Sequence, residues 1–332
     1  TSILLFNLFL EVSAFHSLLI IKPGSFGDVI HALPCAAALK KFQPDLRITW
    51  LVDSRWQDLL TDSPVIDETI AFPRESFGSL PGAFRALPWA RGLGTLRPDM
   101  ALDLQGLLRS ALMARFSRAR HITGLADARE GAGLFYQTVT PVQPGEHAVR
   151  RYLRSIEALG FPRVDTPEFP LPTGTLPAAL PTGRPFVLLH PYARGGGKSL
   201  TRKSIHAFCQ ALAPMTVVLA GRGTPGKSLP DNTVDLLNHT SIPELIGLIR
   251  AAAFVVSVDS GPMHIAAALH SRLLSIHTWS DPRLVGPFNE EASVWQGGEI
   301  RRQRFDKTAL PPPRSPNDDD IAAMAQWVRE RI

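Results

Sequence analysis

Cysteine is the rarest residue in this chain, with only Cys35 and Cys209 among 332 residues. Two cysteines so far apart cannot form a disulfide framework or a zinc site by themselves, and they fit a reducing cytosol. The sequence also lacks the helix-turn-helix, zinc and aromatic RNA-binding patterns of nucleic-acid-binding proteins. We therefore expect a cytoplasmic globular protein that binds no nucleic acid.

Long hydrophobic runs are also missing. The apolar first residues contain Asn7, Glu11 and His16, and neither a basic segment before them nor a cleavage site after them is recognisable. We expect no signal peptide and no transmembrane anchor, and we interpret residues 1–16 as an extension ahead of the first strand. The net charge of +5 favours an anionic partner, although the basic residues are scattered in small groups.

The first half of the chain alternates apolar segments with helical patterns, which predicts parallel βαβ units. Strands are expected at residues 18–22, 47–52, 68–72, 100–104 and 121–125, and helices at 29–42 and 107–116. The pattern stops at seven prolines between residues 162 and 185, where neither a helix nor a central strand is tolerated. We expect an extended linker there.

The alternation then resumes. Strands are expected at residues 185–191, 215–221, 232–238, 254–260 and 272–278, and helices at 205–212, 242–252, 262–269 and from about 320. Ser241 and Glu244 match a capping box that begins the helix at 242–252. We predict an α/β fold of two doubly wound, Rossmann-like domains that face each other across a cleft: residues 1–172, a linker at 173–184, and residues 185–332. Ligands of such folds bind beyond the carboxyl ends of the strands, here after residues 22, 189 and 258.

The segment VVSVDSGPMH (residues 255–264) leads from a buried strand into a helix. Pro262 suits a first helical turn, and the N–H groups and dipole at that end attract phosphate. Gly261 permits close approach of a ligand, and Asp259 suits the hydroxyl groups of a sugar. The alternative is plain helix capping by Asp259 or Ser260.

The segment HPYARGGGKSL (residues 190–200) carries a glycine triplet after a strand. Its backbone, including Gly197, can present N–H groups to an anion, and Lys198 adds a positive charge where a leaving phosphate develops. The spacing is not that of a P-loop. A flexible surface loop is the alternative.

Two further patterns are weaker. GRGTPG (residues 221–226) matches the dinucleotide-binding fingerprint, but the helix that should follow is doubtful because prolines flank the next residues. The run Asp318, Asp319 and Asp320 invites a metal interpretation, but acidic residues also favour the first turn of a helix, and we expect them to cap the last helix.

The segment KPGSFGDVIHALP (residues 22–34) turns sharply at Gly24 and Gly27 and places Asp28 at the head of a helix. A carboxylate there is stabilised in its ionised form and can accept a proton from a sugar hydroxyl. His31 lies on the same helical face and can orient Asp28 or contact an acceptor. Capping by Asp28 and packing by His31 are the alternatives.

Together these segments resemble the ADP-heptose:lipopolysaccharide heptosyltransferases, two-domain enzymes of the GT-B type. The resemblance rests on GSFGDVIHALP, DLQGLLRSAL, AREGAGLFYQ, HAVRRYL and VVSVDSGPMHIAAAL, in the family's order across roughly residues 18–290. It implies an inverting glycosyltransferase that moves a heptose from ADP-heptose to an inner-core lipopolysaccharide or a related glycolipid, without a metal or other cofactor. It also implies that the enzyme acts as a peripheral protein on the cytoplasmic face of the inner membrane.

The resemblance implies roles for particular residues. Asp28 is the catalytic base, Lys198 and the turn at residues 260–264 hold the donor diphosphate, and Asp259 meets donor hydroxyl groups. The donor-binding residues are expected to be Asp259, Ser260, Gly261, His264 and Gly197. The acceptor-binding residues are expected to be Ser25, His31, Arg109 and Arg151.

The sequence departs from the family at two places. Leu200 and Thr201 stand where a Trp-Pro pair is usual, and GRGTPG lacks an acidic residue near the ribose. The alternatives are an NAD-dependent oxidoreductase that uses GRGTPG, and a non-catalytic relative that binds sugar nucleotides.

Overall fold

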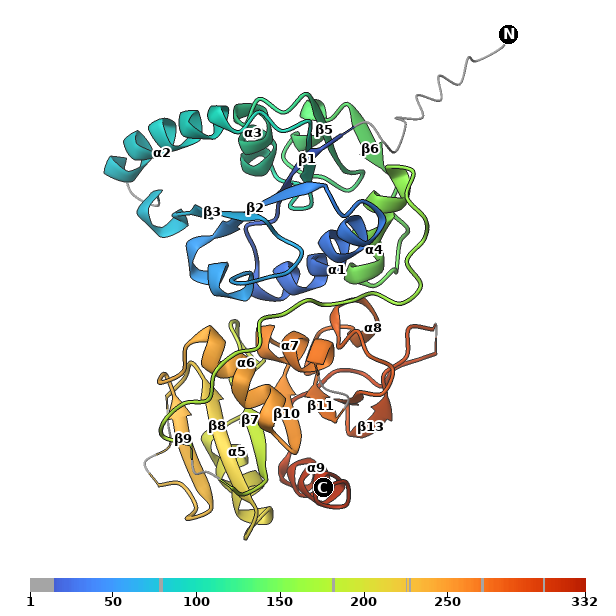
Figure 1. The fold of residues 1–332 in the computed structure, drawn as a ribbon. Coiled ribbons are helices and arrows are strands. Elements are labelled where there is room, and N and C mark those ends of the chain that lie inside the picture. Colours follow the sequence, from blue (N-terminus) through green and yellow to red (C-terminus); the bar gives the residue numbers. More distant parts are fainter. Residues whose placement is uncertain are drawn as a thin grey trace. The chain divides into compact units, whose positions relative to one another are not determined.

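The computed structural model describes residues 15–77, 80–180, 183–224, 226, 228–269, 272–306 and 308–332 (Figure 1). Contacts divide the chain into two compact units, residues 1–144 with 148–170 and residues 145–147 with 171–332. An extension was expected at residues 1–16, and its residues 1–14 lie outside the described residues. The domain boundaries and the linker at 173–184 remain a prediction. Among the described residues, no helix is both long enough and apolar enough to cross a membrane.

The first unit contains a six-stranded sheet and four α-helices among the described residues. Its strands are β1 (Ser17–Ile21), β2 (Arg47–Asp53), β3 (Glu68–Phe72), β4 (Met100–Asp103), β5 (His121–Leu125) and β6 (Thr138–Thr140). Its helices are α1 (Phe26–Phe42), α2 (Leu80–Gly92), α3 (Leu108–Phe116) and α4 (Ala148–Ala158).

The second unit contains a seven-stranded sheet and five α-helices among the described residues. Its strands are β7 (Phe186–His190), β8 (Thr216–Gly221), β9 (Thr233–Leu237), β10 (Phe254–Val258), β11 (Leu273–Ile276), β12 (Ser293–Gln296) and β13 (Glu299–Arg302). Its helices are α5 (Arg202–Ala211), α6 (Ile242–Ala251), α7 (Gly261–Leu269), α8 (Pro282–Val285) and α9 (Asp318–Arg329).

Each sheet reverses its strand order once. The first has the order β3-β2-β1-β4-β5-β6 with parallel pairing throughout, and the chain turns back between β1 and β4. The second has the order β13-β12-β11-β10-β7-β8-β9, with the reversal between β7 and β10. Within the described residues, β13 is the one strand that runs antiparallel, on β12. The doubly wound, Rossmann-like fold expected for both units is confirmed, and the reversal points are where such sheets bind ligands.

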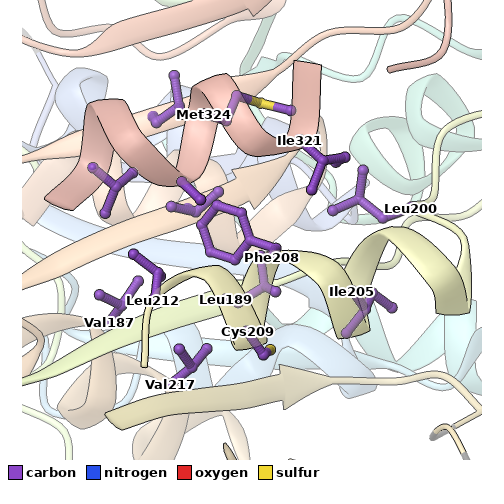
Figure 2. Packing of buried hydrophobic residues seen from close by; sticks show 14 of the residues in the cluster. Val187, Leu189, Leu200, Ile205, Phe208, Cys209, Leu212, Val217, Ile321 and Met324 are labelled. Atoms are coloured by element: carbon purple, nitrogen blue, oxygen red, sulfur yellow. The ribbon is translucent and has the colours of Figure 1, made fainter. Parts of the chain in front are cut away.

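Apolar residues on each sheet pack against the covering helices. In the first unit α1 contacts α4 on one side of the sheet, and α2 lies with α3 on the other (Figure 1). In the second unit, α5 contacts α9, and both helices share one hydrophobic core with the sheet. Figure 2 shows Phe208 of α5 directed toward Met324 and Ile321 of α9, with Leu200 next to Ile321. These fully buried side chains fix the strands whose ends carry the candidate site.

The expected elements are confirmed with shifted ends. Strands β3 and β5 have the predicted bounds, and the predicted capping box of Ser241 and Glu244 begins α6. Helix α1 begins three residues before the predicted start, at Phe26, because Ser25 is its N-cap and Asp28 occupies the third helical position. The last helix begins at Asp318, with Asn317 as its N-cap. Helices α2, α4 and α8 and strands β6, β12 and β13 were not predicted as elements.

Residues 171–175 of the proline-rich segment are hydrogen-bonded to α6. The Thr175 N–H donates to the Pro243 carbonyl at 3.0 Å, and Arg250 donates to the carbonyl of Leu171 at 3.3 Å. Gly174 has a φ of +76°. Gly247 of α6 lies against the same segment, and a Cβ on Gly247 would be only 2.1 Å from the Thr175 carbonyl oxygen. Both glycines are therefore required by this close approach of two backbones.

We expect Gly247→Ala to lower the free energy of unfolding by about 1–3 kcal/mol, because the new methyl group meets backbone that cannot rotate away. Gly196→Ala is the matched control in the same unit, since nothing lies within 4 Å of a Cβ at that position. Urea denaturation followed by circular dichroism measures both. Equal stability of the two variants would contradict the close packing at Gly247.

Candidate active site

The reversal point of the second sheet brings Lys198 and Asp259 together. Lys198 is in the loop after β7, Asp259 follows β10, and the two strands are hydrogen-bonded neighbours. The Lys198 Nζ lies 3.3 Å from the Asp259 Oδ2 and 4.2 Å from the centre of the Trp279 ring. The predicted phosphate-directed lysine and the predicted sugar-directed carboxylate therefore form one ion pair.

Several groups keep Asp259 ionised. Burial opposes the charge, but the neighbouring His277 and His264, a hydrogen bond from Ser280 at 2.8 Å and the charge of Lys198 together lower the pKa of Asp259. His277 is wholly buried, and burial lowers its pKa to about 4, so the imidazole is neutral near pH 7. The carboxylate is a fixed acceptor at the edge of a helix N-terminus.

Helix α7 begins at Gly261, immediately after this carboxylate. Pro262 has no N–H and the Met263 N–H donates to the Ser260 carbonyl at 3.1 Å, so this helix end can meet an anion with the Gly261 N–H and the helix dipole. Ser260 lies beside them, with its Oγ 3.1 Å from the Nδ1 of His190 at the end of β7. His264 is on the first turns of α7 and is 8% exposed. The residues predicted at 259–264 therefore lie at one end of one helix.

The glycine-rich loop is anchored at its end by the two residues that depart from the family pattern. Leu200 is 4% exposed and belongs to the core between α5 and the sheet. Thr201 is the N-cap of α5 and accepts a hydrogen bond from the Ser204 N–H at 3.0 Å. Gly197 has a φ of +77°, which a residue with a side chain rarely adopts. The departure thus supplies an apolar anchor and a helix cap.

The reversal point of the first sheet carries Asp28. Its Oδ2 accepts hydrogen bonds from both the N–H and the Oγ of Ser25, each at 2.9 Å, and its Oδ1 accepts one from the Tyr152 hydroxyl at 3.3 Å. Both oxygens are thus held, and the side chain is still partly exposed. A carboxylate fixed in this way is suited to accept a proton.

Two residues without a role predicted from the sequence, Tyr152 and Lys22, support Asp28: Tyr152 donates to it, and Lys22 lies against the Tyr152 ring. Lys22 is 3% exposed, donates to the Leu104 carbonyl at 3.1 Å and lies 4.9 Å from the Tyr152 ring centre. Burial lowers the pKa of Lys22, while the charge of Asp28 opposes that shift. Burial and then the charge of Asp28 raise the pKa of Tyr152, so its hydroxyl remains a donor.

The remaining predicted acceptor residues lie in the same unit. Arg151 binds both carboxylate oxygens of Asp127, at 2.7 and 2.6 Å. His31 of α1 is 3% exposed, so its side chain faces the interior of the first unit. Arg109 is exposed near the start of α3, and burial of part of its side chain and the nearby charge of Arg74 lower its pKa. Contacts of these residues with an acceptor remain a prediction.

The GRGTPG loop lacks the helix of a dinucleotide site. Of its residues and those up to β9, the described ones form no helix; Pro225 and Lys227 lie outside them. Its glycines instead make room for neighbours, because a Cβ at Gly221 would meet His190 at 2.3 Å and one at Gly223 would meet Tyr192 at 2.1 Å. This geometry gives the oxidoreductase alternative no support.

The acidic run at the start of α9 is a capping device. Asp320 accepts from the N–H of Asn317 and pairs with Arg314, and the other two aspartates complete the first turn. Across the described part of the chain, no group of three or more His, Cys, Asp or Glu side chains is arranged to hold a metal ion.

The sequence patterns led to no assigned role for Lys22, Tyr152, His277 or Ser280. Tyr152 is 124 positions from Asp28 and Ser280 is 21 positions from Asp259, so only the fold brings them together. Lys22 was identifiable as a charged residue at the end of an apolar strand, directly before the glycine turn.

Two doubly wound sheet units, with a held carboxylate at one reversal point and a lysine–carboxylate ion pair at the other, define an α/β protein of the two-domain, Rossmann-like class. Residues 87–311, more than half of the chain, match the model of "Glycosyltransferase family 9 (heptosyltransferase)". The chain belongs to this family of glycosyltransferases. Asp28 precedes the matched residues, whereas Lys198 and Asp259 lie within them.

Relatives and solved structures agree with this assignment. Lipopolysaccharide heptosyltransferase 1 of Salmonella typhimurium is 26% identical over 318 residues, which are 88% of this chain and 98% of that protein. The Pseudomonas aeruginosa protein of the same name is 28% identical over 81% of both chains. The structure of the E. coli heptosyltransferase WaaC with ADP has a TM-score of 0.75 at 22% identity and covers 95% of this chain and all of that one, so the fold is shared.

We expect acid to destabilise the second unit through two buried histidines, His190 and His277. Burial lowers both pKa values to about 4, whereas an unfolded histidine titrates near 6.5. The unfolded chain therefore binds protons first as the pH falls below 6.5, and stability is lost down to about pH 4, on the order of 3 kcal/mol for each histidine.

Urea denaturation near neutral pH and at about pH 4.5 measures this loss. His277→Gln should lose less stability on acidification than the unchanged protein, and the exposed His239→Gln serves as control. The same pH dependence in all three proteins would show that His277 does not titrate as its burial requires.

Proposed function

We propose that this protein is an inverting heptosyltransferase that transfers a heptose from ADP-heptose to an inner-core lipopolysaccharide or a related glycolipid. The observation that carries the proposal is the Lys198–Asp259 ion pair beside the N-terminus of α7, within residues that match the heptosyltransferase family model. It is supported by relatives named lipopolysaccharide heptosyltransferases and by a WaaC structure with ADP-2-deoxy-2-fluoro heptose.

The proton of the acceptor passes to Asp28. As the acceptor hydroxyl oxygen bonds to C1 of the heptose, its proton moves to the carboxylate, and a positioned base contributes ~10²–10⁴-fold to such a step. Ser25 and Tyr152 hold the carboxylate oxygens, so the base needs little reorganisation during the reaction. Arg109 and Arg151 in the same unit suit an acceptor with acidic groups.

The leaving diphosphate is stabilised in the second unit. When the bond between C1 and the diphosphate oxygen breaks, negative charge develops on ADP, and a fixed donor to such charge is worth about 2.7–4 kcal/mol of barrier. Lys198, the backbone around Gly197, and the α7 N-terminus with Ser260, Gly261 and His264 supply donors. Asp259 binds hydroxyl groups of the donor sugar.

The setting of the reaction is part of the proposal. A glycolipid acceptor places the enzyme at the inner membrane, and a net charge of +5 favours peripheral binding to an anionic cytoplasmic leaflet. The chemistry assigned to the residues needs no resident cofactor. Liposome flotation at low and high salt tests the electrostatic part, since attraction of this kind weakens as salt rises.

The direct test is to incubate the protein with ADP-heptose and heptose-deficient lipopolysaccharide and to follow acceptor mass and ADP release. A gain of one heptose together with release of one ADP supports the proposal. Binding of ADP-heptose without any mass gain would favour a non-catalytic relative, and a preference for NADH over ADP would favour an oxidoreductase.

Asp28→Asn should leave ADP binding unchanged and lower kcat by at least ~10²-fold, because the amide cannot accept the proton. Asp45→Asn is the control, as it makes the same chemical change at an exposed position of the first unit. Steady-state kinetics and calorimetric ADP titration provide the readouts. Turnover near that of the unchanged protein would remove Asp28 from the role of base.

Lys198→Met should weaken ADP binding and lower kcat, the latter by about 10²-fold, because the cation that meets the diphosphate is lost while the stem remains. Lys203→Met removes an exposed lysine of the same unit and should change neither quantity. Unchanged kinetics of the Lys198 variant would mean that another cation binds the phosphates.

A further inference from the structure

Four consecutive residues after β11 form a loop next to the candidate donor site. Neither the sequence motifs nor the proposed function assigns them a role. His277, Thr278, Trp279 and Ser280 form what we call the 277–280 loop, between β11 and α8. Strand β11 is hydrogen-bonded to β10 in parallel, so their carboxyl ends lie at the same edge of the sheet. The loop is therefore a neighbour of the turn that carries Asp259.

Three residues of the loop each contact a different part of the donor site. The Thr278 Oγ1 donates to the Gly197 carbonyl at 2.8 Å and fixes the glycine-rich loop. The Trp279 ring lies under the Lys198 ammonium, 4.2 Å from ring centre to Nζ. The Ser280 Oγ donates to the Asp259 Oδ2 at 2.8 Å.

His277 completes the hydrogen bonding of Ser280. Because the single hydroxyl hydrogen of Ser280 goes to Asp259, its oxygen accepts the hydrogen of the His277 Nδ1, 2.9 Å away. This arrangement requires the neutral tautomer that carries its hydrogen on Nδ1, which a wholly buried imidazole adopts readily. The carbonyl of Ser280 is itself bound by the Gln296 Nε2 at 3.3 Å, so β12 holds the loop from behind.

The ammonium of Lys198 is therefore held from two sides. The Asp259 carboxylate and the Trp279 ring face both attract a cation, and the ring also limits where the ammonium can move. Trp279 is 59% exposed, so its position on the surface is not explained by core packing. Its ring contacts the ammonium of Lys198, the lysine that the proposed chemistry uses.

We propose that the 277–280 loop is the positioning element for the diphosphate-binding cation: Ser280, backed by His277, fixes Asp259, and Asp259 with Trp279 fixes Lys198. This inference rests on the proposed function, because it assigns Lys198 to the donor diphosphate. It adds a specific requirement, which is that an aromatic face at position 279 is needed for tight binding of an ADP-type ligand.

The experiment compares Trp279→Leu, Trp279→Phe and Ser280→Ala with Ser315→Ala, an exposed serine of the same unit, as control. We expect Trp279→Leu and Ser280→Ala to weaken ADP binding about 10-fold, as loss of a cation–π contact or of a hydrogen bond to a charged group does. Trp279→Phe should restore most of the affinity, and the control should match the unchanged protein. Calorimetric titration with ADP and thermal melting of each variant are the measurements.

Kinetics separates positioning from a general structural effect. In Trp279→Leu and Ser280→Ala, kcat should fall while KM for the lipopolysaccharide acceptor stays constant. ADP affinities equal to that of the unchanged protein, or an equal loss in Trp279→Phe and Trp279→Leu, would overturn the inference. If the unchanged protein transfers heptose while these variants bind ADP normally, only the role of the loop is wrong. If the unchanged protein neither binds ADP nor transfers heptose, the proposed function itself fails.

Discussion

The reversal of strand order in each sheet is the constraint on which the candidate site depends. At a reversal the loops of two adjacent strands leave in opposite directions, which opens a place for a ligand at their carboxyl ends. In the first unit this happens between β1 and β4, and the turn with Asp28 follows β1. In the second it happens between β7 and β10, and Lys198 and Asp259 follow these strands. Each half of the proposed chemistry thus has its own topological origin.

The two sites have opposite electrostatic roles in the proposed reaction: one accepts a proton, and the other binds negative charge. In the proposed reaction Asp28 accepts a proton. It is held through hydrogen bonds by Ser25 and Tyr152, and the buried Lys22 lies against the Tyr152 ring. In the same proposal the second unit binds a diphosphate with a lysine, a helix N-terminus and a glycine-rich backbone. Lys198 is itself paired with Asp259, so a donor that brings its phosphates to this lysine also brings its sugar close to the carboxylate. The proposed recognition of sugar and of diphosphate is therefore coupled through one ion pair.

Local sequence patterns predicted much of the fold but little of what supports the site. The periodicity and the capping box of Ser241 and Glu244 act over a few residues, and those elements were predicted well. The hairpin of β12 and β13 was missed although Gly297 and Gly298, both with positive φ, are a strong turn signal. The contacts of Tyr152 with Asp28 and of Ser280 with Asp259 depend on which strands become neighbours, and no local pattern encodes them.

The central claim is that the donor diphosphate binds at the end of β7 and β10. A crystal structure of the complex with ADP tests it most directly. We expect phosphate oxygens within hydrogen-bonding distance of the Lys198 Nζ and of the Gly261 N–H at the start of α7. Phosphates bound instead at the turn after β1, next to Asp28, would contradict it.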